Sequence, residues 1–245
     1  MISKVKLKEL SSFRQQKNCE EQHLFIVEGV KMVEEAIRND VPIKTLCCLS
    51  TWAEGHQEYL KDLEWYEITP AELERLSLQK SPNQVWALCQ RSLPSAPTGN
   101  QGLIIALDHI QDPGNLGTII RTADWFGIRE IVCSHDTVDC FNPKVVQSTM
   151  GGIFRTDIRY TDLYQWLSGC DKTICGALLN GESIETQTPP SNAVLVIGNE
   201  SKGISPEIQT LIQKKLLIPN IGNTAESLNA SVATGILMAW FKLRN

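Results

Sequence analysis

Three loops in the second half of this 245-residue sequence carry polar side chains directly after apolar runs. The first, DPGNLGTIIRTADWFG (112–127), follows LIIALDHI and places Arg121 one turn into a predicted helix. The second, GNESKGIS, follows VLVI and carries Glu200, and the third, NIGNTAESLN, follows LLIP and carries Asn229. Ligands bind at the carboxyl ends of strands in open parallel sheets. Three such loops in one domain therefore predict a binding site.

The first loop has neither the G-x-G-x-x-G spacing of dinucleotide-binding folds nor the G-K-[ST] ending of a phosphate-binding P-loop. One interpretation is a Pro-Gly turn followed by a helix that Asn115 or Thr118 caps. Arg121 could then pair with Asp124, three residues on. The rest of this helix is apolar, however, and an arginine near backbone N–H groups suits an anion such as a phosphate.

The second and third loops each have a structural interpretation as well. In the second, Ser201 lies three residues after Gly198 rather than two, which disfavours the nucleophile elbow of a hydrolase. In the third, Ser227 is the expected N-cap of the last helix. Asn229 would lie inside that apolar helix, where its amide needs a hydrogen-bond partner. His109, between two aspartates, is expected to take part only in local turn contacts.

Composition favours an ordinary globular protein, with 42% hydrophobic and 21% charged residues. Residues 1–17 hold five basic residues and one acidic residue, a net of +4, so the other 228 residues carry −9 of the total −5. A basic arm fits contact with a polyanion, although a solvated amphipathic helix gives the same pattern. The eight cysteines form no C-x-x-C pair and no apolar run is long enough for a membrane span. We expect a reduced, cytoplasmic protein without a metal site.

Two domains are predicted, 1–95 and 96–245, because RSLPSAPTGNQG (91–102) has the composition of a linker. The first domain alternates helices and strands, with single helices expected over 4–17 and 52–63. The apolar runs of the second domain are continuous, which is typical of a parallel sheet covered on both faces. The last helix, SLNASVATGILMAWF, is apolar nearly all round, so we expect it to be buried in the core or against a partner chain.

The three loops together, in this order at the end of the chain, resemble the motifs of the SpoU (TrmH) family of RNA ribose methyltransferases, in the SPOUT class. The intermediate STMGGIFR also resembles a segment of that family. The resemblance covers most of residues 102–245 and extends more weakly to FIVEGVKMVEEAI and SPNQVWAL, which are similar to the family's substrate-binding domain. It implies a parallel α/β domain with a C-terminal trefoil knot, which pattern alone would never predict. It also implies a small N-terminal α/β domain with a ribosomal-protein-like fold, and a homodimer.

The resemblance further implies the site residues. The implied catalytic residues are Asn115, Arg121, Glu200, Ser227 and Asn229. The implied cofactor is S-adenosylmethionine, held by Gly198, Ile218, Leu228, Ile197, Asn199 and Leu178. The sequence departs from the family pattern at Gly152, Ser201 and Ala230, which affects details of the pocket.

The implied reaction is methylation of a ribose 2'-hydroxyl in structured RNA, with ribosomal RNA favoured over transfer RNA by the two-domain layout. The alternatives are a transfer RNA methyltransferase, a base methyltransferase, and a non-catalytic RNA-binding or assembly factor that keeps the fold. Arg121 acts in one version as a base, and in the other as a charged clamp on the flanking phosphate. Glu200 would orient either Arg121 or Asn115.

Overall fold

The structure is a computed structural model that describes residues 2–92, 102–222 and 226–244. Its contacts group the chain into two units. The first combines Met1–Ser92 with Phe141–Phe154, and the second combines Leu93–Cys140 with Arg155–Asn245. The predicted boundary near residue 95 lies outside the described residues. The sequence did not predict that residues 141–154 pack with the first unit.

The first unit is built on a four-stranded sheet in the order β1-β4-β2-β3. Strand β4 is antiparallel to β1 and β2, and β3 pairs parallel with β2 at one edge. The strands are β1 (Leu24–Glu28), β2 (Ile43–Cys48), β3 (Trp65–Glu67) and β4 (Val85–Gln90). The helices are α1 (Lys4–Ser12), α2 (Gln16–Glu21), α3 (Val30–Arg38), α4 (Ser50–Gly55), α5 (Gln57–Leu60), α6 (Pro70–Leu76), α8 (Pro143–Thr149) and the 3-10 turn η1 (Gly152–Phe154).

Two helices predicted as single elements are each divided in two, so both predictions were wrong in this detail. The first breaks at Phe13, whose side chain turns into the core, and the Asn18 amide donates to the carbonyl of Ser12. The second breaks after Gly55, and the His56 ring lies 2.8 Å from the carbonyl oxygen of Trp52. In both places a side chain engages a carbonyl oxygen near the end of the helix. At the start of α6, Thr69 forms a complete capping box with Glu72.

The cysteines behave as small hydrophobes. Seven of the eight are buried, and none forms a disulfide. Burial raises the pKa of the Cys47 thiol to about 12 and that of Cys19 to about 11. These thiols stay protonated at neutral pH and contribute packing rather than reactivity.

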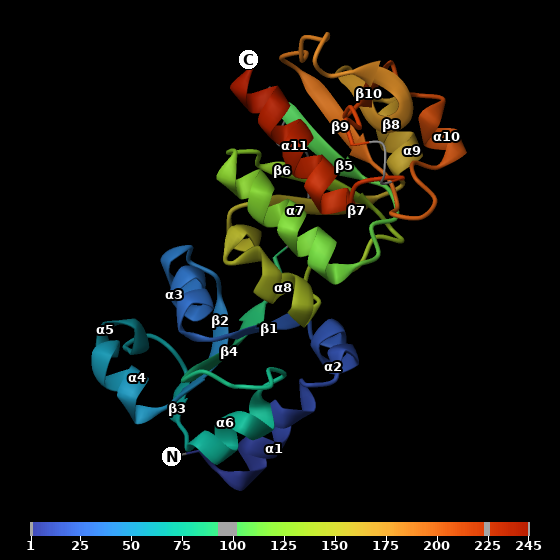
Figure 1. Ribbon diagram of the computed structural model, residues 1–245. Helices are drawn as coiled ribbons and strands as arrows, with labels where there is room; N and C mark the ends of the chain where they lie inside the picture. The colour runs from blue at the N-terminus through green and yellow to red at the C-terminus, as the bar shows by residue number, and fades with distance from the viewer. Residues whose placement is uncertain (1, 93–101, 223–225, 245) are drawn as a thin grey trace. The chain divides into compact units, whose positions relative to one another are not determined.

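The second unit holds a six-stranded sheet in the order β10-β8-β9-β5-β6-β7, in which every pairing is parallel (Figure 1). The strands are β5 (Leu103–Leu107), β6 (Glu130–Ser134), β7 (Asp157–Thr161), β8 (Thr173–Ser183), β9 (Ala193–Ile197) and β10 (Lys214–Leu217). The helices are α7 (Pro113–Trp125), α9 (Leu163–Ser168), α10 (Pro206–Gln209) and α11 (Ala230–Leu243). The predicted parallel sheet is confirmed.

Helices account for the burial of the central strands. On one face Leu163 and Leu167 of α9 and Ile208 of α10 join a core cluster with alternate residues of β5, β6, β8 and β9. Helices α7 and α11 pack against each other and lie across the sheet (Figure 1). The middle strands β6 and β9 are buried along their whole length, which explains their continuously apolar sequences.

Helix α11 is buried in the core on one side only, so the first of the two expected ways of burial does not cover the whole helix. Leu237, Met238 and Phe241 are fully covered, whereas Val232 is 50% exposed and Leu243 is 77% exposed. In the described part of the chain, no helix has the length and apolarity that crossing a membrane requires. The trefoil knot stays a prediction, because residues 223–225, just before α11, lie outside the described residues.

Candidate active site

The order of strands in the second unit creates the site. The chain runs from β5 outward to β6 and β7, and then returns on the other side of β5 as β8, β9 and β10. All strands run parallel, but the order in which the chain adds them reverses between β5 and β9, which are hydrogen-bonded neighbours. Ligands of open parallel sheets bind at such a switch point. The first loop follows β5 and the second follows β9, so the two polar loops meet at this point.

Asn115 is the centre of a hydrogen-bonded set that joins all three loops. Its side chain is buried, and its amide nitrogen donates to Oε1 of Glu200 at 2.6 Å. Its amide oxygen accepts from the amide nitrogen of Asn229 at 2.9 Å. Three of the five predicted catalytic residues are thus brought into direct contact, although 114 positions separate Asn115 from Asn229.

The position of Asn115 is fixed by the start of α7. The N-cap of this helix is Asp112, whose carboxylate accepts from the backbone N–H of Asn115 at 2.8 Å. Pro113 follows at the first helical position, where its missing N–H costs nothing. The predicted caps, Asn115 and Thr118, were therefore wrong: Asp112 has the extended backbone of an N-cap, and the Asn115 side chain is left to reach across the sheet.

The position of Asn229 is fixed in the same way at α11. Asn229 is the N-cap of this helix, and its amide oxygen accepts from the backbone N–H of Ser231 at 2.9 Å and of Val232 at 3.3 Å. The predicted cap, Ser227, was wrong, because the helix begins only at Ala230. Ser227 is exposed and makes no hydrogen bond with the described part of the chain. Asn229 uses its oxygen to cap the helix and its nitrogen to hold Asn115.

The first two loops are joined at two further points, which the sequence did not predict. The buried carboxylate of Asp108 accepts from the backbone N–H of Ser205 and lies within 2.7 Å of the His109 ring. The Asn199 amide donates to the backbone oxygen of His109 at 2.9 Å. These bonds hold the loop that carries Glu200 against the end of β5. The signal was the pair Asp108-His109 at a strand end, which was interpreted as local turn chemistry.

Arg121 stands apart from this set. It is exposed and makes no hydrogen bond or ion pair with any described residue. The alternative pairing with Asp124 was wrong, because Arg155 binds that carboxylate through Nε and Nη2 at 2.9–3.1 Å. Of the two orienting roles considered for Glu200, the structure has the one towards Asn115. The guanidinium of Arg121 is left available for an anion.

Four of the six predicted cofactor residues lie at the carboxyl ends of β9 and β10. Ile197 ends β9 and is followed by Gly198 and Asn199, while Ile218 follows β10. Leu178 lies in β8, where its ladder with β10 shifts register after Gly176. Leu228, in the third loop, is half exposed.

These residues fit a nucleoside ligand. The backbone amide and carbonyl groups of Gly198, Ile218 and Leu228 make no hydrogen bond within the described residues, which leaves them for water or a ligand. The side chains of Ile218, Leu178 and Leu228 are all partly exposed, so apolar surface is available beside these polar groups. Groups of acidic, histidine and cysteine side chains that could hold a metal ion are absent from the described part of the chain.

Gly198 allows the second loop to close on itself. Asn199 and Gly203 exchange backbone hydrogen bonds at 2.9–3.0 Å, which brings Gly203 over Gly198. A Cβ at position 198 would lie only 2.2 Å from the Gly203 carbonyl carbon. A larger residue at this position must therefore push the loop away from the sheet.

A parallel α/β unit with a polar site at its switch point defines a broad class of ligand-binding enzyme domains. Residues 102–239 match the model of the SpoU rRNA Methylase family, and residues 4–87 match the MRM3-like substrate binding domain. The chain therefore belongs to the SpoU rRNA methylase family, and it is an RNA methyltransferase of the class that the sequence predicted. The predicted family is confirmed.

Several known proteins are similar to this chain over nearly its whole length, including both matched domains. The 23S rRNA (guanosine(2553)-2'-O)-methyltransferase RlmP of Bacillus subtilis is 28% identical over 95% of this chain and 94% of its own length. A structure described as a putative RNA methyltransferase of the TrmH family from Porphyromonas gingivalis is 34% identical, with a TM-score of 0.87 and all of both chains covered. The AdoMet-bound rRNA methyltransferase from Sinorhizobium meliloti is 27% identical, with a TM-score of 0.87 over 99% of this chain and 97% of that one.

The close approach at Gly198 gives a test of the second loop. We expect Gly198→Ala to lower stability by about 1–3 kcal/mol, because the backbone of Gly203 has no room to move without breaking its bonds. The same variant should lose S-adenosylmethionine binding in calorimetry. Gly55→Ala is the matched control, since a Cβ at that helical position meets nothing within 4 Å. Full cofactor affinity in Gly198→Ala would contradict the assignment of this loop.

Proposed function

We propose that this chain transfers the methyl group of S-adenosylmethionine to a ribose 2'-hydroxyl of ribosomal RNA. The observation that carries the proposal is the hydrogen-bonded set of Asn229, Asn115 and Glu200, because it joins the three loops that resemble the family's motifs. Ribosomal RNA is favoured as substrate since the Bacillus subtilis and Sinorhizobium meliloti relatives, which cover both parts of the chain, are described as rRNA methyltransferases. A ribosomal substrate also favours a cytoplasmic location.

The cofactor would be held by the backbone groups of Gly198, Ile218 and Leu228, and when bound it supplies an electrophilic methyl group. The protein then has to align the 2'-hydroxyl and ease its deprotonation. Glu200 is exposed and has only Oε1 bonded to Asn115, so Oε2 has no partner within the described residues. This second oxygen is a hydrogen-bond acceptor for the substrate hydroxyl. Asn115 and Asn229 keep the carboxylate in one orientation.

Arg121 acts in this proposal as a clamp on the phosphate beside the target ribose. The version in which it acts as a base needs a buried guanidinium, whereas Arg121 is exposed in the single chain. A charged guanidinium binds phosphate through two parallel hydrogen bonds and stabilises negative charge on the reacting oxygen. Acting as a phosphate clamp therefore requires no burial of Arg121, whereas acting as a base does.

Variants of Arg121 test its role. Both Arg121→Ala and Arg121→Lys should lose at least about tenfold in methyl transfer to ribosomal RNA, because one bidentate contact is worth about 1.5–3 kcal/mol. Cofactor affinity measured by calorimetry should not change. Arg129→Ala removes another exposed arginine of the same unit and should stay active. A fully active Arg121→Lys would contradict a bidentate contact between Arg121 and phosphate.

The role of Asn229 can be separated from its cap. Asn229→Ala should cost about 1 kcal/mol in stability through loss of the N-cap and about 1–3 kcal/mol more because the buried Asn115 oxygen loses its donor. It should also lose nearly all activity because Asn115 is released. Asp162→Ala is the control, since Asp162 caps α9 of the same unit by accepting from Gln165. A larger loss of stability in Asn229→Ala than in Asp162→Ala, with activity lost only in Asn229→Ala, supports the set. Equal activity in both variants would contradict the proposed role of the hydrogen-bonded set.

A homodimer is part of the proposal, because the apolar side of α11 is left uncovered in the single chain. Val232, Ile236 and Leu243 are exposed on this helix, and Trp125, at the end of α7, is 85% exposed. Such a patch marks a protein interface. Light scattering after gel filtration should give twice the mass of the chain, and Ile236→Glu should give the monomer mass with the fold retained by circular dichroism. A monomeric wild type rules the dimer out.

A further inference from the structure

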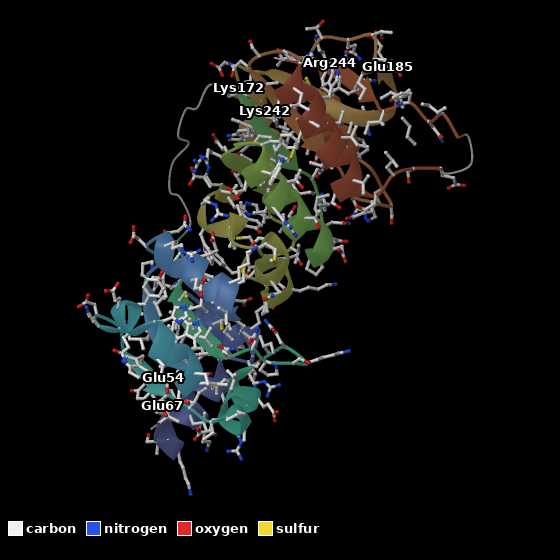
Figure 2. The ribbon with its side chains drawn as sticks, turned by 60° about the vertical axis from the view of Figure 1, so that its left-hand side comes forward. Glu54, Glu67, Lys172, Glu185, Lys242 and Arg244 are labelled. Carbon is white, nitrogen blue, oxygen red and sulfur yellow. The ribbon has the colours of Figure 1, made fainter. Side chains whose placement is uncertain are left out.

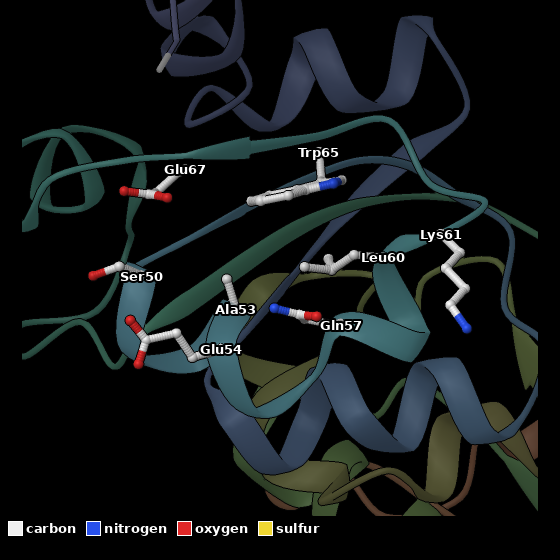
Figure 3. A pocket seen from close by; sticks show the side chains of 8 residues that line it. All are labelled: Ser50, Ala53, Glu54, Gln57, Leu60, Lys61, Trp65 and Glu67. Carbon is white, nitrogen blue, oxygen red and sulfur yellow. The ribbon is translucent and has the colours of Figure 1, made fainter.

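A hollow on the first unit is not used by the proposed reaction. It has a volume of about 420 Å³ and lies between α4, α5 and the edge strand β3 (Figure 3). The residues that line it are Ser50, Ala53, Glu54, Gln57, Leu60, Lys61, Trp65 and Glu67. All of them belong to the first unit, so the hollow is complete within it.

The hollow has an apolar middle and an acidic end. Ala53 and Leu60 are buried beneath it, and the indole of Trp65 is 36% exposed over it. Glu54 from α4 and Glu67 from β3 lie on the same side of the first unit in both views (Figure 2, Figure 3). In the close view Ser50 lies between them and Lys61 lies at the opposite end of the hollow (Figure 3). Trp65 and Glu67 share one face of β3 because alternate residues of a strand point the same way.

Three polar side chains of the hollow are free of polar contacts within the part of the chain that the structure describes. The side chains of Glu54, Glu67 and Gln57 make no hydrogen bond or ion pair with another described residue. The surrounding segment 50–67 contains five acidic residues and one lysine, a net of −4. An RNA phosphate is repelled by this surface, whereas a cation is attracted to it.

We propose that this hollow binds an arginine or lysine side chain from a basic peptide segment of a protein partner. The aliphatic part of such a side chain would lie on Leu60 and the indole of Trp65, where a cation also gains from the aromatic face. Its charged head would lie between the carboxylates of Glu54 and Glu67. This partner site is separate from the RNA methyltransferase site in the second unit and goes beyond the proposed reaction.

The probe is a fluorescent peptide of alternating arginine and glycine, titrated with the full-length protein at an ionic strength of about 0.15 M, where distant charges are screened. We expect saturable binding that Glu54→Gln/Glu67→Gln weakens about fivefold, because two exposed ion pairs contribute about 1 kcal/mol together. Trp65→Leu keeps the hollow apolar and should weaken binding about threefold through loss of the cation–π contact. A peptide with citrulline in place of arginine should not bind.

The matched control is Glu58→Gln/Asp62→Gln, which removes the same charge from the same segment but from residues that do not line the hollow. It should change the dissociation constant less than about twofold, as expected for screened charges at a distance. Equal weakening by both double variants would overturn the proposal in favour of diffuse attraction. Equal binding of the citrulline peptide would also overturn it.

An RNA oligonucleotide is the remaining competitor. We expect that a single-stranded RNA does not displace the labelled peptide from the first unit's hollow and that Trp65→Leu leaves RNA affinity unchanged. RNA binding that is lost in Trp65→Leu but kept in Glu54→Gln/Glu67→Gln would identify a base-stacking site instead, and the peptide proposal would fail. Circular dichroism of each variant checks that the fold is retained.

Discussion

The candidate active site depends on the two ends of one buried amide. Asn115 donates to Glu200 from its nitrogen and accepts from Asn229 at its oxygen, so neither end is left unsatisfied. An unpaired buried amide costs about 1–3 kcal/mol, which means that each loop is stabilised by the presence of the other two. The site is therefore assembled cooperatively, and its geometry is lost as a whole when one member is removed.

Helix termini supply the fixed points of this assembly. Asp112 caps α7 and orients the backbone at Asn115. The side-chain oxygen of Asn229 caps α11, and the nitrogen of the same amide donates to Asn115. The exchange of Asp108 and Asn199 bonds between the first two loops adds a second attachment. Rigid elements thus hold the polar side chains at the strand ends, which is the condition for an arrangement that does not have to reorganise during reaction.

Much of this was predictable from sequence because local patterns report burial and strand ends. Continuous apolar runs predicted the parallel sheet, and the resemblance of three ordered loops to the family's motifs implied Asn115, Glu200 and Asn229. The caps were predicted less well, since Ser227 and Asn229 are both good N-caps and only the start of α11 at Ala230 decides between them. The Asp124–Arg155 pair and the packing of residues 141–154 with the first unit depend on long-range contacts that no local pattern reports.

The central claim is that this chain methylates ribose hydroxyls of ribosomal RNA through the joined loops. The most direct measurement is a map of 2'-O-methyl groups in the ribosomal RNA of cells with the protein, without it, and with Asn115→Ala in its place. The account predicts one or a few methyl groups that disappear in the last two cases and return with the unaltered protein. An identical map in all three cells would contradict it.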